Sequence, residues 1–201
     1  SLGLSAPVAP VPAVGRDVLR VSVIRLPRLS NWTDVDALRS EPGVLVRFAT
    51  TAEELADADL VVLPGTRATV VDLAWVRARG LDRVLADRAA QGRPVLGVCG
   101  GYQMLGRSVQ DAVESRAGEV PGLGLLPVTT VFGPDKVLGR PTGRWGPHPV
   151  TTAYEIHHGV VTRHGGEPLH GRAAEHPTAV VAGVQSGLVS LLVDSIDSPV
   201  N

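Results

Sequence analysis

The chain has 201 residues, of which 44% are hydrophobic and 19% are charged, a composition that suits one well-packed domain and argues against disorder. Nineteen basic residues against twenty acidic ones give a formal net charge of −1, so we expect no binding to nucleic acid or to an anionic membrane surface. No apolar run approaches the roughly 20 residues that span a bilayer. The single cysteine, Cys99, excludes an internal disulfide, fits a reducing, cytoplasmic location, and is too few thiols for a zinc or iron–sulfur site built on several thiolates.

The first segment, Ser1–Gly15, is rich in proline and alanine and has no apolar period. This composition is typical of an extended linker or of a frayed terminus. We therefore predict a linker or disordered tail over residues 1–17 and one domain over residues 18–201. If the segment is a linker, the chain is the C-terminal part of a longer protein.

Strand-like and helix-like patterns alternate through the first half of the domain. In chain order, the patterns first predict a strand over 18–26, a short helix from Ser30 or Asn31 to about 39, and a strand over 44–49. The capping box of Thr51 and Glu54 opens a further short helix, and a strand over 60–63 follows. Two helices within 70–91, divided at Gly80, then lead to a strand over 94–98 and a helix over 100–109. Alternation of this kind implies crossover connections. The predicted fold is therefore α/β: a doubly wound, mostly parallel sheet with helices on both faces.

Beyond residue 115 the pattern is weaker. Residues 128–132, 154–157 and 180–184 are further candidate strands, separated by loops rich in glycine and proline. We find no internal repeat and no second domain.

The most informative segment is PVLGVCGGYQMLG, residues 94–106. A short apolar strand runs into Cys99 and a helix begins at once, with glycines on both sides of the cysteine. Such a sharp turn holds its central residue in a strained conformation with room only for small neighbours, as in a nucleophile elbow. The N–H groups and positive dipole end of the following helix favour thiolate over thiol and can hold an oxyanion. The segment predicts a nucleophile, with a buried, inert cysteine as the alternative.

A second strand end carries Pro64, Gly65 and Thr66. Ligands of parallel α/β sheets bind at the carboxyl ends of the strands. If this strand neighbours the strand before Cys99, the Gly65 N–H can supply a second oxyanion donor. Otherwise the segment is an ordinary turn.

Four segments together resemble a known family. GVCGGYQMLG, residues 97–106, resembles the nucleophile motif of class I glutamine amidotransferases, and its Gly-Gly-Tyr-Gln form resembles that of the cobyric acid synthase group. Three more segments match that group in the same order: RLPRLSNWTDVDAL (25–38), ADLVVLPGTRATVVDLAW (58–75) and YEIHHG (154–159). The resemblance covers about residues 18–162.

The resemblance implies a flavodoxin-like amidotransferase fold and a glutaminase reaction. Cys99 would attack the side-chain amide of glutamine, release ammonia and leave a glutamyl thioester that water hydrolyses. Gly65 and Gly100 would offer backbone N–H groups to the oxyanion, and Gln103 would help to hold the glutamine. Three residues of the YEIHHG segment would line the same pocket: Tyr154, Glu155 and His157.

The resemblance also implies a partner. In this group the ammonia passes to a site that activates corrin-ring carboxylates with ATP and magnesium, on the route to cobalamin. The present sequence has no G-x-x-x-x-G-K-[ST] phosphate loop, and its only lysine, Lys136, stands in FGPDKVLG. We therefore expect no cofactor and no metal in this domain, and ATP and magnesium in an upstream synthetase domain of the same parent chain or of a separate subunit.

One element of the family pattern is not matched. A thioester mechanism needs a general acid and base, and the family carries a late histidine for it, in a strand ending Trp-His-Gly or Leu-His-Gly. Here Asp194 and Ser195 follow the candidate strand 188–193. Three explanations are open: an altered terminus, substitution by His176, or a catalytically impaired domain that only docks on a partner.

Two further functions stay open at the level of sequence. The glutaminase subunit for lipid II amidation shares the Cys-Gly-Gly-Tyr-Gln turn, although the SNWTDVDAL match favours the corrin enzyme. A cysteine hydrolase on the same scaffold also uses a nucleophile elbow, but would not require Gln103 or the YEIHHG segment.

Overall fold

The computed structural model describes residues 18–139, 143–145, 148–150, 155–163, 179–181, 183–185 and 188–190. The predicted linker, residues 1–17, and the pocket residue Tyr154 lie outside the described residues, as do His176 and the segment 191–201.

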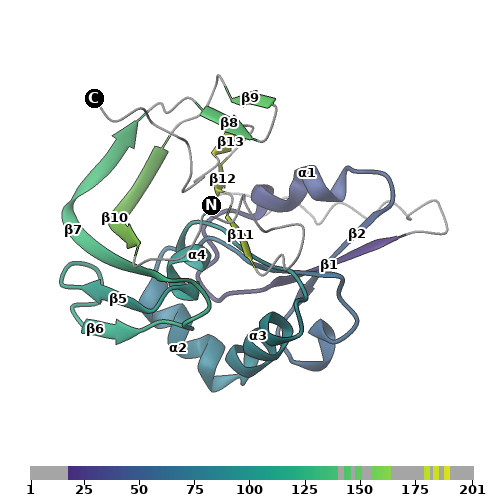
Figure 1. Cartoon of the computed structure of the whole chain (residues 1–201), viewed down its shortest axis with the longest axis horizontal. Coiled ribbons are helices and arrows are strands. Elements are labelled where there is room, and N and C mark those ends of the chain that lie inside the picture. The colour runs from purple at the N-terminus through teal and green to yellow at the C-terminus, as the bar shows by residue number, and fades with distance from the viewer. Residues whose placement is uncertain are drawn as a thin grey trace, which may run out of the picture.

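A five-stranded, fully parallel sheet forms the centre of the molecule, in the order β11-β4-β3-β1-β2 (Figure 1). Its strands are β1 (Leu19–Ile24), β2 (Val44–Ala49), β3 (Leu60–Leu63), β4 (Val95–Gly97) and β11 (Ala179–Val181). The first four fall where alternating or continuous apolar residues predict strands. Their parallel pairing confirms the predicted α/β class.

Helices cover both faces of this sheet (Figure 1). On one side are a 3-10 turn, η1 (Trp32–Val35), and α1 (Asp36–Arg39). Asn31 caps the start of η1, where its side chain accepts a hydrogen bond from the Thr33 N–H. On the other side are α2 (Thr69–Ala78) and α3 (Leu81–Ala90), divided as predicted at Gly80, which has φ +68°. No helix among the described residues is long and apolar enough to cross a bilayer.

The side chains of β3 show how the two faces are filled. Val61 and Leu63 belong to a core cluster with the helix residues Leu73 and Leu85, whereas Val62, between them, packs in a second cluster with Val35. All six are buried. Because successive strand residues point to opposite faces, a continuous apolar strand fits a sheet covered on both sides.

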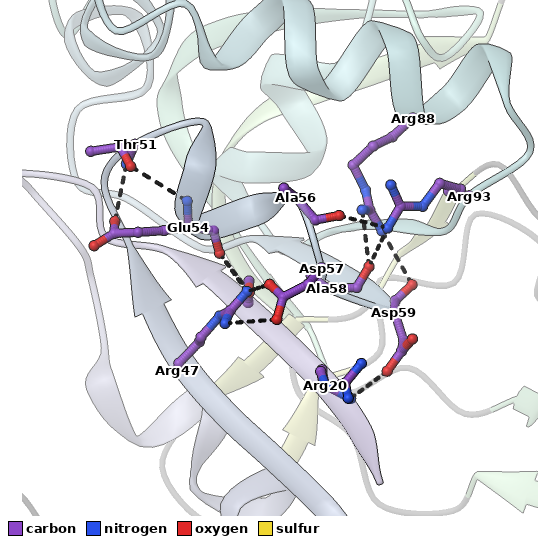
Figure 2. A network of polar contacts seen from close by, with 11 residues as sticks. Arg20, Arg47, Thr51, Glu54, Ala56, Asp57, Ala58, Asp59, Arg88 and Arg93 are labelled. Atoms are coloured by element: carbon purple, nitrogen blue, oxygen red, sulfur yellow. Dashed lines mark hydrogen bonds and ion pairs between the residues drawn. The ribbon is translucent and has the colours of Figure 1, made fainter. Parts of the chain in front are cut away.

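The connection from β2 to β3 is short and polar. It contains one 3-10 turn, η2 (Glu53–Leu55), where Thr51 and Glu54 form the predicted capping box: the Thr51 N–H donates to Glu54 Oε2 at 3.1 Å. Arg47 pairs with Asp57 (Figure 2).

Two arginines that precede β4 in the chain donate hydrogen bonds to the end of the same connection. Arg88, 2% exposed, donates to the carbonyl oxygens of Ala58 and Asp59, and Arg93 donates to that of Ala58 (Figure 2). Arg88 also donates to the Pro94 carbonyl. Burial lowers the pKa of Arg88 to about 10. The buried arginine thus supplies hydrogen-bond donors to carbonyls at the amino-terminal edge of the sheet.

The end of the helix after Cys99 differs from the prediction. The helix after Cys99, α4 (Gly100–Leu105), is shorter than the predicted 100–109, and residues Ser108–Asp111 form a strand, β5. Gly106 is extended, with ψ 179°, and the Arg107 N–H donates to the Val128 carbonyl at 2.7 Å. Pairing with a distant strand therefore ends the helix at the glycine.

A second sheet, in the order β10-β7-β5-β6, follows from this pairing. Its other strands are β6 (Gly118–Pro121), β7 (Val128–Gly139) and β10 (Glu155–Arg163), and β7 and β10 extend the candidate strands 128–132 and 154–157. The candidate strand 180–184 is divided between β11 and β12. Two small antiparallel pairs complete the described elements: β8 (Gly143–Trp145) with β9 (His148–Val150), and β12 (Gly183–Gln185) with β13 (Leu188–Ser190).

Candidate active site

Cys99 occupies the sharp turn between β4 and α4. Its backbone has φ +50° and ψ −113°, and among the described non-glycine residues only Arg116 also has a positive φ. This conformation is strained for a residue with a side chain and is kept only where the surroundings enforce it. The predicted nucleophile-elbow geometry is therefore present.

Glycines on both sides make this turn possible. A Cβ atom on Gly97 would lie 2.7 Å from the Tyr102 Cα, and one on Gly101 would collide with the Leu63 carbonyl oxygen. Main chain packs directly on main chain at both positions. The Gly101 N–H donates to the Val98 carbonyl at 2.8 Å, which closes the turn.

Cys99 is partly buried rather than sealed in the interior. Val98, before it, is 6% exposed and belongs to the core cluster on the α1 side of the sheet. The cysteine thus stands where the buried strand emerges at the carboxyl edge of the parallel sheet, the edge at which ligands of such folds bind.

Gly65 lies directly beside the cysteine. Strands β3 and β4 are neighbours, with Leu63 opposite Gly97, and a Cβ atom on Gly65 would be 3.5 Å from the Cys99 Cβ. The condition set by the sequence, that the two strands be adjacent, is confirmed. The contribution of the Gly65 N–H to an oxyanion site stays a prediction.

Gln103 and Gly100 complete the group around Cys99. Gln103, one helical turn after the cysteine, is 6% exposed, and the Thr69 hydroxyl donates to its Oε1 at 3.3 Å. A Cβ atom on Gly100 would be 2.8 Å from the Thr66 Cγ2. The structure therefore brings four of the predicted site residues together, at the junction of β3, β4, α2 and α4.

Sequence reasoning missed the loop that supports Gly65. The chain between β1 and η1 runs beside the loop after β3: the Ser30 N–H donates to the Gly65 carbonyl at 3.0 Å, and the Arg67 N–H donates to the Arg28 carbonyl at 3.0 Å. The two segments, RLPRLSNW and PGTRATVVD, each belong to a matched motif. Their mutual contact depends on the order of the strands, which the motifs do not reveal.

The remaining predicted pocket residues lie on the second sheet. Glu155 and His157 are on β10, opposite Gly139 and Val137 of β7. This sheet is joined to the cysteine turn through α4 and β5. In the described part of the chain, no three histidine, cysteine, aspartate or glutamate residues are grouped so that they could hold a metal ion.

Comparison with known proteins identifies the family. Residues 20–191 match the model of the CobB/CobQ-like glutamine amidotransferase domain. The chain belongs to this family. A solved glutamine amidotransferase, 16% identical, covers 74% of this chain and 76% of its own with a TM-score of 0.55, which shows the same amidotransferase fold.

Curated relatives refine the placement within this family. A cobyric acid synthase from Frankia casuarinae is 58% identical over 178 residues, which are 87% of this chain and 32% of the relative. Cobyric acid synthases from Streptomyces coelicolor and Mycolicibacterium gilvum are 60% and 64% identical over 79% and 72% of this chain, and 31% and 30% of their own lengths. The amidotransferase chain thus spans about a third of the length of the curated relatives it matches.

Proposed function

We propose that this amidotransferase domain is the glutaminase part of a cobyric acid synthase. It releases ammonia from glutamine for an ATP-dependent partner domain, which amidates carboxylates of a corrin ring on the route to cobalamin. The identity of 58% to 64% to proteins of that name supports this assignment, as does the match of residues 20–191 to a glutamine amidotransferase domain.

The geometry of Cys99 carries the proposed chemistry. The Cys99 thiolate attacks the side-chain amide carbon of glutamine, and the carbonyl electrons move to oxygen. As the tetrahedral intermediate collapses, the amide nitrogen takes up the proton that the Cys99 thiol lost on ionisation and leaves as ammonia, giving a thioester. Water then adds to the thioester, and its collapse yields glutamate and restores the thiol. Strain and a glycine-lined turn keep the cysteine in this position without a side chain crowding the approach.

Neighbouring residues take the roles that their positions support. The N–H groups of Gly65 and Gly100 stabilise the oxyanion, and Gln103, held by Thr69, binds the glutamine. For Tyr154, Glu155 and His157 the proposed role, lining the other side of the pocket, rests on the resemblance of the YEIHHG segment alone. Oxyanion donors contribute because they are aimed in advance at the charge that develops in the transition state.

The ATP and magnesium of the overall reaction belong to the partner domain in this proposal. The chain has no phosphate-loop sequence, and glutamine hydrolysis by a cysteine needs neither group. We place the protein in the cytoplasm, where ATP is available and a single cysteine remains reduced.

The decisive experiment separates the two nitrogen sources. The chain, together with its ATP-dependent partner, is assayed for corrin amidation with glutamine and with ammonium as the nitrogen donor, before and after Cys99→Ala. We expect the variant to lose glutamine-driven amidation and to keep ammonium-driven amidation, which serves as the internal control for folding and docking. Unchanged glutamine-driven amidation would refute the proposal, whereas wild-type protein that amidates only from ammonium would favour a docking domain.

A further inference from the structure

A fully buried carboxylate joins the two loops that support the cysteine turn. Asp72, on α2, is 0% exposed. Its Oδ2 accepts a hydrogen bond from the Thr66 hydroxyl at 2.6 Å and another from the Arg28 N–H at 3.2 Å. The Arg28 guanidinium lies 3.5 Å from Oδ1. A buried charge is tolerated only with such partners, so these contacts hold Asp72 and its partners in one geometry.

Thr66 connects this carboxylate to both proposed oxyanion donors. It follows Gly65 in the chain, and it also packs on Gly100, where a Cβ atom would meet the Thr66 Cγ2 at 2.8 Å and the Thr66 nitrogen at 3.2 Å. The Thr66 hydroxyl in addition accepts the Ala68 N–H at 3.0 Å. A shift of Thr66 would therefore displace the peptide groups of Gly65 and Gly100, which both lie beside Cys99.

Arg28 provides the second connection. Its carbonyl accepts the Arg67 N–H, and two residues later the Ser30 N–H donates to the Gly65 carbonyl, both at 3.0 Å. Since Asp72 holds Arg28 through the backbone N–H and the guanidinium, it fixes the loop that in turn holds Gly65.

We propose that Asp72 is a positioning residue for glutamine hydrolysis: through Thr66 and Arg28 it keeps the N–H groups of Gly65 and Gly100 where an oxyanion will form. The inference rests on the proposed function of Cys99. Asp72 itself does not touch the substrate. Loss of one oxyanion donor costs about 100- to 1,000-fold in kcat, so partial misplacement of two donors is expected to cost about tenfold or more.

Three variants test the connection. Asp72→Asn keeps the shape of the side chain but removes its charge, and Thr66→Val removes the hydroxyl at constant volume. Both are expected to lower kcat for glutamine hydrolysis about tenfold or more, with KM for glutamine changed by less than about threefold. Thr66→Ser keeps the hydroxyl and is expected to stay within about threefold of the wild type. Thr66→Val keeps the Cγ2 methyl that packs on Gly100 and loses only the hydroxyl, whereas Thr66→Ser keeps the hydroxyl and loses that methyl. Compared with the wild type, the first variant measures the hydrogen bond and the second measures the methyl contact.

A matched control exists at the other buried carboxylate of the described residues. Asp111, 1% exposed, accepts the N–H groups of Val113, Glu114 and Ser115 at the end of β5. Asp111→Asn removes an equally buried charge away from the cysteine turn, and is expected to leave kcat unchanged even where it lowers the melting temperature.

The second readout is alkylation of Cys99 by iodoacetamide, which requires the thiolate but forms no oxyanion. In Asp72→Asn we expect an unchanged alkylation rate together with the lowered kcat. If kcat per alkylatable site is unchanged and only the melting temperature falls, Asp72 is merely structural and the inference is overturned. If alkylation slows in proportion to kcat, Asp72 acts on the thiol and the oxyanion role is wrong. Should Cys99→Ala still hydrolyse glutamine, the proposed function itself fails; should only Cys99→Ala lose activity, the positioning role alone fails.

Discussion

At the carboxyl end of β4 main chain packs on main chain, whereas in the connection from β2 to β3 arginine side chains fill the space between backbone carbonyls (Figure 2). The first region uses Gly97 and Gly101 to bring strands and helix into contact. The second uses Arg88 and Arg93, whose guanidinium groups reach carbonyls more than 20 residues away in sequence. The first region thus leaves peptide groups uncovered at the carboxyl edge of the sheet, whereas the second covers carbonyl groups with side chains at the amino-terminal edge.

The difference follows from what each region has to do. In the proposed reaction, peptide N–H groups bind the developing oxyanion, which requires that no side chain cover them. Small residues and exact backbone placement at the cysteine turn fit that role. The connection to β3 has only to satisfy its carbonyls, and a planar guanidinium with five N–H donors does so from several directions. We therefore expect almost any added atom in the first region to destabilise the fold. In the second region, we expect the loss of stability to depend on how many hydrogen bonds a substitution removes.

The largest expected effect is at Gly101, where one added methyl group meets main chain. In Gly101→Ala the new Cβ atom would collide with the Leu63 carbonyl oxygen, which cannot move without breaking the pairing of β3 with β4. We expect a loss of at least about 3 kcal/mol in the free energy of unfolding, measured by urea denaturation. Gly133→Ala is the control, since a Cβ atom there meets no other atom within 4 Å. Equal stability of the two variants would contradict the tight packing assigned to the cysteine turn.

Arg88→Met tests the second region and should be the next largest effect. The substitution keeps most of the buried volume but removes the donors to the Ala58, Asp59 and Pro94 carbonyls. The Ala58 carbonyl keeps its hydrogen bond from Arg93, and the Pro94 carbonyl keeps the one from the Val61 N–H. Loss of the three arginine hydrogen bonds is still expected to lower the free energy of unfolding by about 2–3 kcal/mol, with glutamine hydrolysis per folded molecule unchanged. Arg83→Met, at an exposed position of the same helix, should stay within about 0.5 kcal/mol of the wild type. A full-sized loss in Arg83→Met would show that the effect comes from the helix and not from the carbonyl contacts.

In both regions the sequence predicts the local features but not the long-range contacts. The capping box at Thr51 and Glu54, the division at Gly80 and the strained turn at Cys99 depend on residues a few positions apart, and the local pattern predicts all three. The partners of Asp72 and Arg88 come from other strands and loops, so their contacts depend on the order of the strands in the sheet.

The end of α4 shows the same limit. Apolar residues at helical spacing continue past Gly106, and a glycine inside a helical pattern is not by itself a stop signal. The helix ends there because Arg107 pairs with Val128, and the second sheet that follows joins strands distant in sequence. Strands β7 and β10 also contain residues that interrupt strand patterns, such as Gly133, Pro134 and Gly159, so their full length could not be predicted.

A third variant sharpens the comparison within the cysteine turn, because Gly65 faces a side chain and not main chain. In Gly65→Ala the new Cβ atom would be 2.6 Å from the Ser30 Oγ, and the displaced peptide should lower kcat for glutamine hydrolysis about tenfold. Gly65 does not adopt a positive φ, so the clash is the main cost. Removing the hydroxyl in the double variant Gly65→Ala/Ser30→Ala should therefore recover most of the activity.

Ser30→Ala alone supplies the reference for this cycle. It keeps the backbone N–H that donates to the Gly65 carbonyl, and should change kcat by less than about threefold, well under the 1.4 kcal/mol of a tenfold effect. If the double variant remains as slow as Gly65→Ala, contact with Ser30 is not the cause of the loss, and another neighbour of Gly65 has to account for it.

The smallest expected effect concerns the capping box in the connection from β2 to β3. Hydrogen bonds from the backbone N–H groups of Thr50 and Thr51 lower the pKa of Glu54. Because the folded-state pKa is below the unfolded one, the carboxylate stabilises the fold fully above about pH 4.3, the ordinary pKa of a glutamate, and this contribution is lost as the pH falls through the lowered folded-state pKa. Glu54→Gln should therefore be less stable than the wild type at neutral pH, and the difference should shrink in acid.

Urea denaturation at neutral pH and at several values below about pH 4.3 measures this convergence. Glu41→Gln, at an exposed glutamate outside the capping box, controls for the loss of one negative charge. A difference between wild type and Glu54→Gln that stays constant down to low pH would mean that the amide replaces the carboxylate as a cap, and that this connection depends on hydrogen-bond geometry and not on charge. In that case the capping box would resemble the cysteine turn, because both would be held by the placement of neutral groups.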